Sequence, residues 1–278
     1  MKKNLGTLQK YAFYIYERRN NMINKGIKNE LIYISYLNKK QVRQLNPLMQ
    51  ELINVLYDNI DENNIVYATK NKEKDKTDIL ITINNIEKNL SLKIEDKNSF
   101  HLEPISEFIH FLIINNFKKD VIEKYLYFHY ADKTKNGTGK TRISVKEYKK
   151  LNQKDIDYLN QKFNNKEFIE KCIERFILQG RNKKSKRVDA IIIGKTNDFF
   201  YLTTKEIKEI IYEHINIETT GLHIGPLFIQ LQTTNLNYNK KYEKCRYNVQ
   251  IKWYNLIDQI LWYRNDQIIK KINAEKDD

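Results

Sequence analysis

Residues 77–100, TDILITINNIEKNLSLKIEDKNSF, contain two short aliphatic runs joined by a polar turn. The first run, 78–83, opens with Asp78, and the second, 90–95, carries Lys93 among aliphatic residues. Short runs rich in β-branched residues and bounded by polar turns are typical of β-strands. An antiparallel hairpin through residues 84–89 would therefore bring Asp78 and Lys93 together at one end of a sheet.

The position of Lys93 within a strand has two explanations. Alternation along a strand places Ser91, Lys93 and Glu95 on one face and the aliphatic residues on the other. An ordinary amphipathic strand with its polar face in water accounts for that pattern. The alternative is a catalytic site. A strand-end carboxylate can bind a divalent metal, and a nearby lysine can hold or deprotonate water or neutralise a phosphate. Phosphodiester hydrolysis needs such groups.

The composition limits the class of protein. The chain has 278 residues, of which 41% are apolar, so it can bury a sizeable core. The net charge of +14 favours a polyanionic partner such as a nucleic acid, although solubility alone also explains a basic surface. Two cysteines without CxxC spacing predict neither a disulfide framework nor a cysteine zinc site, which fits a reducing cytoplasm. No run reaches the roughly 18 apolar residues of a membrane span.

The pattern along the chain mixes the two kinds of secondary structure. Strands are expected at 64–70, 78–83, 90–95, 188–194 and 199–203, with late strands over 226–234 and 246–253. Helices are expected at 7–23, 40–60, 105–117, 119–130, 155–179, 203–215 and 255–264. Within 40–60, Asn46 and Pro47 can restart the helix as cap and first residue, and Ser106 can cap the helix of 105–117. Strands interspersed with helices predict an α/β protein with helices around one central sheet.

Asp78, a gap, and then Ser91-Leu92-Lys93 resemble the signature of the PD-(D/E)xK, or restriction-endonuclease-like, nucleases. Two positions depart from that signature: Thr77 stands where proline is usual, and Ser91 stands where an acid is usual. The segment LSLKIEDKNSFHLEPISEFIHFL and the later RFILQG, RVDAIIIG and RYNVQIKW also resemble stretches in that group. The resemblance covers much of residues 60–260, but only 77–107 carries recognisable chemistry.

The resemblance implies roles for individual residues. Asp78 would be a metal ligand, and Lys93 would orient water or stabilise charge. A glutamate from the helix after the lysine strand can replace an acid missing at Ser91, which points to Glu107, with Glu103 as its competitor. Glu51, on the helix before the first strand, is a further catalytic candidate. The loop residues beside the site would position a phosphate or a metal-bound water, and they are Asn98, Ser99 and His101.

Basic and polar segments supply candidate DNA contacts. One loop, 131–142, carries Lys133, Lys135, Lys140 and Arg142. A second cluster, 180–187, carries Arg181, Lys183, Lys184, Lys186 and Arg187. Lysine and arginine contact phosphates, while amides such as those of Gln230 and Gln232 can pair with base edges. Solvated loops and a polar edge strand explain the same residues without DNA.

Two weaker patterns compete with this interpretation. NGTGK at 136–140 resembles half a phosphate loop, but the full G-x-x-x-x-G-K-[ST] spacing is absent, so nucleotide hydrolysis is not expected. Asp189 at a strand start and Lys195 six residues later form an alternative acid–lysine pair. It ranks below Asp78 and Lys93 because Lys195 is expected in the turn after its strand.

The resemblance implies a restriction-endonuclease-like mixed central sheet flanked by helices, with added helical segments. One nuclease domain would span 1–278, with a helical part over 1–60, a catalytic sheet core over 61–130 and a helical, DNA-contacting remainder over 131–278. The expected activity is Mg2+-dependent cleavage of double-stranded DNA in a restriction system, by a homodimer with a companion methyltransferase. The alternatives are a non-catalytic nucleic-acid-binding protein with a degenerate site and an RNA-directed nuclease.

Overall fold

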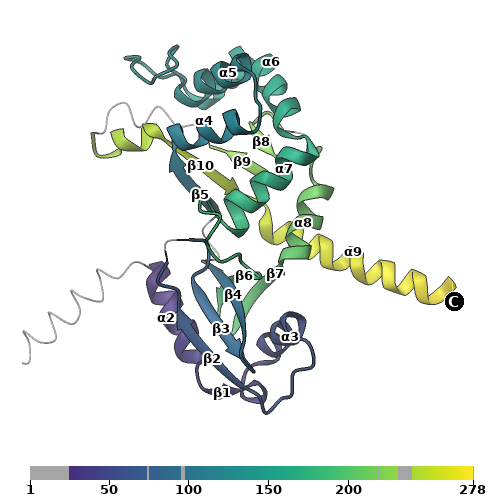
Figure 1. Ribbon diagram of the computed structural model, residues 1–278. Helices are drawn as coiled ribbons and strands as arrows, with labels where there is room; N and C mark the ends of the chain where they lie inside the picture. Colours follow the sequence, from purple (N-terminus) through teal and green to yellow (C-terminus); the bar gives the residue numbers. More distant parts are fainter. Residues whose placement is uncertain (1–24, 74, 95–97, 218, 231–239, 278) are drawn as a thin grey trace, which may run out of the picture. The chain divides into compact units, whose positions relative to one another are not determined.

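The chain forms two compact units that alternate along the sequence. The computed structural model describes residues 25–73, 75–94, 98–217, 219–230 and 240–277 (Figure 1). The first unit contains the described residues before 95 together with Lys186–Tyr201. The second unit contains those between 96 and 185 and those from 202 onward. The 96–185 segment is thus inserted between two parts of the first unit.

The first unit is built on a mixed six-stranded sheet with the order β1-β2-β3-β4-β6-β7. Its strands are β1 (Lys40–Gln41), β2 (Ile65–Lys70), β3 (Ile79–Ile83), β4 (Ile86–Lys93), β6 (Ala190–Lys195) and β7 (Asp198–Thr203). Strands β1 to β4 pair in antiparallel fashion, and β6 runs parallel to β4. The mixed α/β class expected from the sequence is confirmed.

The β3–β4 hairpin follows directly from its turn sequence. Asn84 and Asn85 both have left-handed backbone conformations, with φ of 50° and 64°. Two consecutive left-handed residues are the requirement of the tightest hairpin turn, and asparagine tolerates them better than most residues. Ile83 therefore pairs with Ile86, and β4 begins four residues earlier than the sequence pattern suggested.

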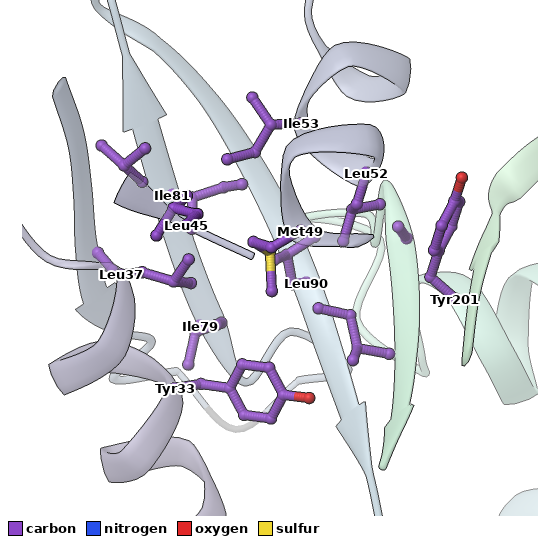
Figure 2. Packing of buried hydrophobic residues seen from close by; sticks show 14 of the residues in the cluster. Tyr33, Leu37, Leu45, Met49, Leu52, Ile53, Ile79, Ile81, Leu90 and Tyr201 are labelled. Atoms are coloured by element: carbon purple, nitrogen blue, oxygen red, sulfur yellow. The ribbon is translucent and has the colours of Figure 1, made fainter. Parts of the chain in front are cut away.

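One face of this sheet packs against helices α2 (Lys25–Leu37) and α3 (Pro47–Leu56). Figure 2 shows Tyr33 and Leu37 from α2 and Met49 from α3 lying over Ile79 of β3 and the rest of the sheet. Asn46 caps α3, because its side chain accepts a hydrogen bond from the Met49 N–H at 2.9 Å. The expected helix start at Asn46 and Pro47 is confirmed. Residues 40–44 instead form β1 and the 3₁₀ helix η1 (Val42–Gln44).

The second unit contains an antiparallel sheet with the order β5-β10-β9-β8. Its strands are β5 (Ser99–Pro104), β8 (His223–Ile224), β9 (Leu227–Ile229) and β10 (Asn248–Trp253). Its helices are α4 (Ile105–Ile114), α5 (Lys119–Tyr130), α6 (Val145–Phe163), α7 (Lys166–Ile173), the π-helix η2 (Glu174–Leu178), α8 (Thr204–Glu213), the 3₁₀ helix η4 (Lys240–Tyr247) and α9 (Leu256–Asp277).

Two expectations about these elements were wrong. One central sheet was expected, but NSFHLEP, interpreted as a loop, forms β5 and pairs with β10 in a second sheet. Ser106 does not cap α4, because the helix already begins at Ile105 behind Pro104. Helix α2 was not predicted, and the helix expected at 7–23 lies outside the described residues. Within the described part of the chain, no helix is long and apolar enough to cross a membrane.

Candidate functional site

The predicted hairpin places Asp78, directly before β3, beside the C-terminal part of β4. Ile79 pairs with Leu90, and the Asp78 N–H donates to the Leu90 carbonyl at 2.9 Å. The carboxylate of Asp78 turns toward β4, where Oδ2 accepts the Ser91 hydroxyl at 3.1 Å and the Leu92 N–H at 2.6 Å. Both hydrogen bonds reach the same carboxylate oxygen, Oδ2. The expected approach of the two strands at this end of the sheet is confirmed.

The polar face of β4 is not an ordinary solvent-facing surface. Ser91 is only 2% exposed, which contradicts the expectation of a polar face in water at this position. On the neighbouring strand, Ile191 pairs with Ser91 and Ile193 pairs with Lys93, and both isoleucines are buried. Burial on both faces of β6 is typical of a strand in a parallel pair. Asp78 and Lys93 thus occupy an apolar part of the sheet.

Burial disfavours the charge on both ionisable groups. It raises the pKa of Asp78, and the Leu92 N–H, the Lys93 charge and the Ser91 hydroxyl oppose that shift only in part. Burial likewise lowers the pKa of Lys93, and attraction to Asp78 offsets this only in part. Structural ion pairs usually stabilise both charges, whereas functional sites tolerate charges that their surroundings disfavour. Asp78 and Lys93 both carry charges that their surroundings disfavour.

A second buried polar cluster lies in the second unit, around Arg175. Its Nη2 atom donates to Glu103 Oε2 at 2.7 Å, and His101 Nε2 lies 3.2 Å from the same oxygen. Glu103 is only 2% exposed. Burial raises the pKa of Glu103, but the hydrogen bonds and charges of His101 and Arg175 outweigh it, so the pKa lies below its ordinary value. This cluster stabilises the ionised carboxylate, in contrast to Asp78.

Glu107 lies at the outer side of the same cluster. Its carboxylate is 3.3 Å from Arg181 Nη1 and 4.0 Å from Arg175 Nη2, and its side chain is 44% exposed. The structure therefore gathers four predicted residues around an arginine that the sequence analysis missed: His101, Glu103, Glu107 and Arg181. Arg175 lies among apolar residues in the segment ERFIL, as Lys93 does in LSLKIE. A charged residue within an apolar run could therefore have identified Arg175 as well.

Glu51 belongs to the first unit, as Asp78 does, but the hydrogen-bond partner of its carboxylate is Tyr201. Its carboxylate accepts the Tyr201 hydroxyl of β7 at 2.5 Å, from an exposed position on α3.

The alternative acid–lysine pair, Asp189 and Lys195, is not brought together. Asp189 Oδ2 accepts the Asn89 N–H at 2.8 Å beside the start of β6, whereas Lys195 ends that strand. Six residues of strand span roughly 20 Å, which is too far for a shared reaction centre.

The basic loop 131–142 is organised around a buried carboxylate. Asp132 accepts the Gly139 N–H at 3.0 Å and an Arg246 Nη2–H at 3.3 Å. Gly139 lies so close to Asp132 that a Cβ atom there would be 2.3 Å from the Asp132 carbonyl oxygen. The NGTGK sequence is therefore explained by the internal packing of the loop.

The predicted DNA contacts of this loop divide into exposed and buried residues. Lys133 and Lys140 are exposed, and Lys135 pairs with Glu123 at 2.9 Å. Arg142 is only 3% exposed, and burial followed by repulsion from Arg246 lowers its pKa to about 10. Three lysines of the loop can thus face a polyanion.

All five basic residues of the second cluster, 180–187, are exposed. Arg181, Lys183 and Lys184 belong to the second unit, and Lys186 and Arg187 belong to the first. Lys186 forms an ion pair of 2.5 Å with Glu87, with both side chains about 40% exposed. A surface segment of this charge density is a suitable contact for a phosphate backbone.

The polar residues proposed near the site pair with each other in the second sheet. Ser99 Oγ accepts the Gln250 side-chain amide at 3.0 Å, and the Asn98 carbonyl accepts the Trp253 N–H at 2.8 Å. The Gln230 N–H donates to the Gln250 carbonyl at 2.9 Å. Gln232 lies outside the described residues.

The number of acidic side chains at a site limits which metal ion the site can hold. In the described ranges no three His, Cys, Asp or Glu side chains form a group that could hold a metal ion. Mg2+ needs fewer protein ligands, because it keeps several waters and is commonly held by one or two carboxylates plus substrate phosphates. The oxygen donors of Asp78 fit such an ion when a phosphate supplies further ligands.

Neither protein-family models nor curated protein sequences match this chain. The resemblance to PD-(D/E)xK nucleases therefore rests on Asp78, directly before β3, and on Ser91 and Lys93 of β4. A functional assignment must come from the chemistry of those groups.

Proposed function

We propose that this protein is a Mg2+-dependent endonuclease that hydrolyses phosphodiester bonds in double-stranded DNA. The observation that carries the proposal is that Asp78 and Lys93 interact electrostatically across the β3–β4 hairpin, at positions where burial disfavours both charges. A fold retains such a pair at a cost in stability, which is a property of functional sites.

Asp78 would hold the metal through Oδ1. Its Oδ2 atom is held by the Ser91 hydroxyl and the Leu92 N–H, so the carboxylate is fixed before the substrate arrives. When bound, Mg2+ supplies charge that polarises a phosphoryl oxygen and favours deprotonation of water. Ser91 thus acts by orienting the carboxylate, and the absence of an acid at this position does not remove its use.

Lys93 would act on the same phosphate as a cation or as a proton acceptor. In its charged form, Nζ can donate hydrogen bonds to the phosphoryl oxygens, whose negative charge grows in the transition state. Burial lowers its pKa, which raises the fraction of neutral amine that can take a proton from the attacking water. Both roles require Lys93 to lie beside the scissile phosphate.

The proposed metal site does not need a glutamate in addition to Asp78. Glu103 is already held by Arg175 and His101, and Glu107 lies against Arg181 and Arg175 in the second unit. Phosphate and water oxygens can complete the coordination of Mg2+ around one carboxylate.

The net charge of +14 and the exposed segment 180–187 support a nucleic acid as the substrate. Cleavage of both strands at a symmetric site by a homodimer, with a methyltransferase protecting the host, is the restriction role that would follow.

The test is incubation of plasmid DNA and of double-stranded RNA with the purified protein, in Mg2+ and in EDTA. Asp78→Ala and Lys93→Ala are compared with the wild type, and Lys195→Ala serves as a matched control from the neighbouring strand. We expect Mg2+-dependent DNA fragments that both site variants abolish and the control retains. Cleavage in EDTA or by Asp78→Ala would contradict the mechanism. Cleavage of RNA alone would show an RNA-directed nuclease, and salt-dependent DNA binding without cleavage a non-catalytic binder.

A further inference from the structure

A separate cavity lies in the second unit, where the turn between α4 and α5 meets α6 and α7. Its volume is about 660 Å³. Small-molecule sites commonly enclose roughly 300–1,000 Å³, so the cavity has the size of a ligand site. All of its lining residues fall between Asn115 and Lys171, within one unit, and none belongs to the β3–β4 site.

Aromatic side chains form part of the wall. Phe117 lies edge-on to Phe168, with ring centroids 4.6 Å apart, and Phe168 is buried beneath it. Tyr158, from α6, contributes a second ring to the lining. Asn116, in a left-handed conformation with φ of 62°, turns the chain sharply just before Phe117. The wall thus offers partly exposed ring surface to a flat ligand.

The two acids of the lining are already satisfied by neighbouring side chains. Asp120 accepts the Tyr158 hydroxyl at 2.6 Å, and this hydrogen bond is the main reason that the pKa of Asp120 is below its ordinary value. Glu167 pairs with Lys171 at 2.5 Å. The positive charge of Lys118 also contributes to lowering the pKa of Asp120.

With three lysines and two acids, the lining carries a net charge of +1. Lys118 precedes the first turn of α5, and Lys162 lies one turn beyond Tyr158, with its ammonium 5.2 Å from that ring. Within the described residues, neither has a carboxylate within 4.0 Å. Asn115 adds a polar group: its amide N–H donates to the Phe111 carbonyl at 2.7 Å, which leaves the side-chain oxygen as an acceptor.

We propose that this cavity binds a nucleotide, with the base against Phe117 and Tyr158 and the phosphate between Lys118 and Lys162. An aromatic wall, an amide acceptor and two ammonium groups match a ligand that combines a flat polar ring with an anion. Inorganic phosphate would leave most of 660 Å³ unfilled, and an apolar ligand would leave the lysines without a partner. The nucleotide can be free or the 5′ end of a strand.

The test measures binding to the full chain by isothermal titration calorimetry. The probes are AMP, adenosine, inorganic phosphate and a short 5′-phosphorylated single-stranded oligonucleotide. Lys118→Ala and Lys162→Ala are compared with Lys154→Ala, an exposed lysine of the same helix α6 that does not line the cavity. Circular dichroism and thermal melting establish that each variant is folded. Asp78→Ala is titrated as well, because loss of the nuclease site leaves this cavity intact.

We expect saturable binding of AMP, weakened about tenfold by each cavity variant and unchanged in Lys154→Ala and Asp78→Ala. Adenosine and phosphate should each bind at least about tenfold more weakly than AMP. If the oligonucleotide binds as tightly as AMP or more tightly, the ligand is the 5′ end of a strand. If it binds more weakly than AMP, the ligand is a free nucleotide. No saturable AMP binding, phosphate binding as tight as AMP, or equal weakening by the control would overturn the proposal.

Discussion

Replacing Asp78 and Lys93 together by neutral residues should stabilise the protein while abolishing the proposed activity. The double variant Asp78→Asn/Lys93→Met removes two charges that burial disfavours. The asparagine oxygen can still accept the hydrogen bonds from Ser91 and Leu92, and methionine retains most of the length of lysine. Packing at the site and the two hydrogen bonds to residue 78 are therefore largely preserved.

The expected gain follows from the cost of burying a charge pair. Each unit of pKa shift corresponds to about 1.4 kcal/mol between the charged and neutral forms. Replacement of buried ion pairs by neutral residues of similar volume is often neutral or stabilising by about 1–4 kcal/mol. Because both side chains are partly exposed, we expect the lower half of that range, about 1–2 kcal/mol. Each kcal/mol corresponds to about 2–4 °C in melting temperature for a chain of this size.

The pH dependence provides an independent check. The folded-state pKa of Asp78 lies above its ordinary value of 3.8, so wild-type stability falls as the pH rises from 3.8 through the raised pKa. The pKa of Lys93 lies below its ordinary value of 10.5, so stability rises with pH from the lowered pKa to 10.5. Both slopes should be absent from the double variant.

Chemical denaturation monitored by circular dichroism, repeated across that pH range, measures these differences. The control is Glu87→Gln/Lys186→Met, which removes an exposed pair of the same unit and should change stability by less than about 1 kcal/mol. A loss of more than about 1 kcal/mol in the site variant would show that the pair holds the fold together. Asp78 and Lys93 would then be a structural pair, and their assignment as a catalytic site would be refuted.

Three further predictions concern single substitutions. Ser91→Ala removes one donor to Asp78, which should raise the pKa of Asp78 further and shift the acidic limb of the cleavage pH profile upward. Asn46→Ala removes the α3 cap and the hydrogen bond that the Asn46 amide donates to the Thr196 carbonyl, and it should cost about 1–2 kcal/mol in denaturant unfolding. Arg175→Met leaves Glu103 buried with His101 as its remaining partner, and should lower the free energy of unfolding by about 3–5 kcal/mol. This loss should become smaller as acid protonates Glu103, which denaturant unfolding below pH 4.5 would measure.

The parts of the fold that the sequence predicts are those fixed by local physics. The β3–β4 hairpin depends on two β-branched runs and on the conformation of Asn84 and Asn85, all within sixteen residues. The start of α3 depends on Asn46 and Pro47. Asp78 and Lys93 could be placed together because the register of a hairpin follows from its turn.

The missed parts depend on partners distant in sequence. The segment 98–104 is too polar to suggest a strand by itself, and it becomes β5 by pairing with β10 about 150 residues later. Glu103 can be buried within that strand only because Arg175, 72 residues away, neutralises it. A sequence pattern shows a candidate charge, but its partner becomes visible only in the folded chain.

The insertion of residues 96–185 between β4 and β6 affects how the protein can be made. Strand β4 must wait for its parallel neighbour until the intervening segment has been synthesised, because Leu90 pairs with Ala190. At about 5–20 residues per second, the ribosome takes roughly 5–20 s to deliver β6. During that interval the nascent sheet ends in an unpaired edge that carries Leu90, Ser91 and Leu92, a surface prone to strand-to-strand association. The same arrangement that buries Asp78 and Lys93 thus makes the growing chain dependent on protection of that edge.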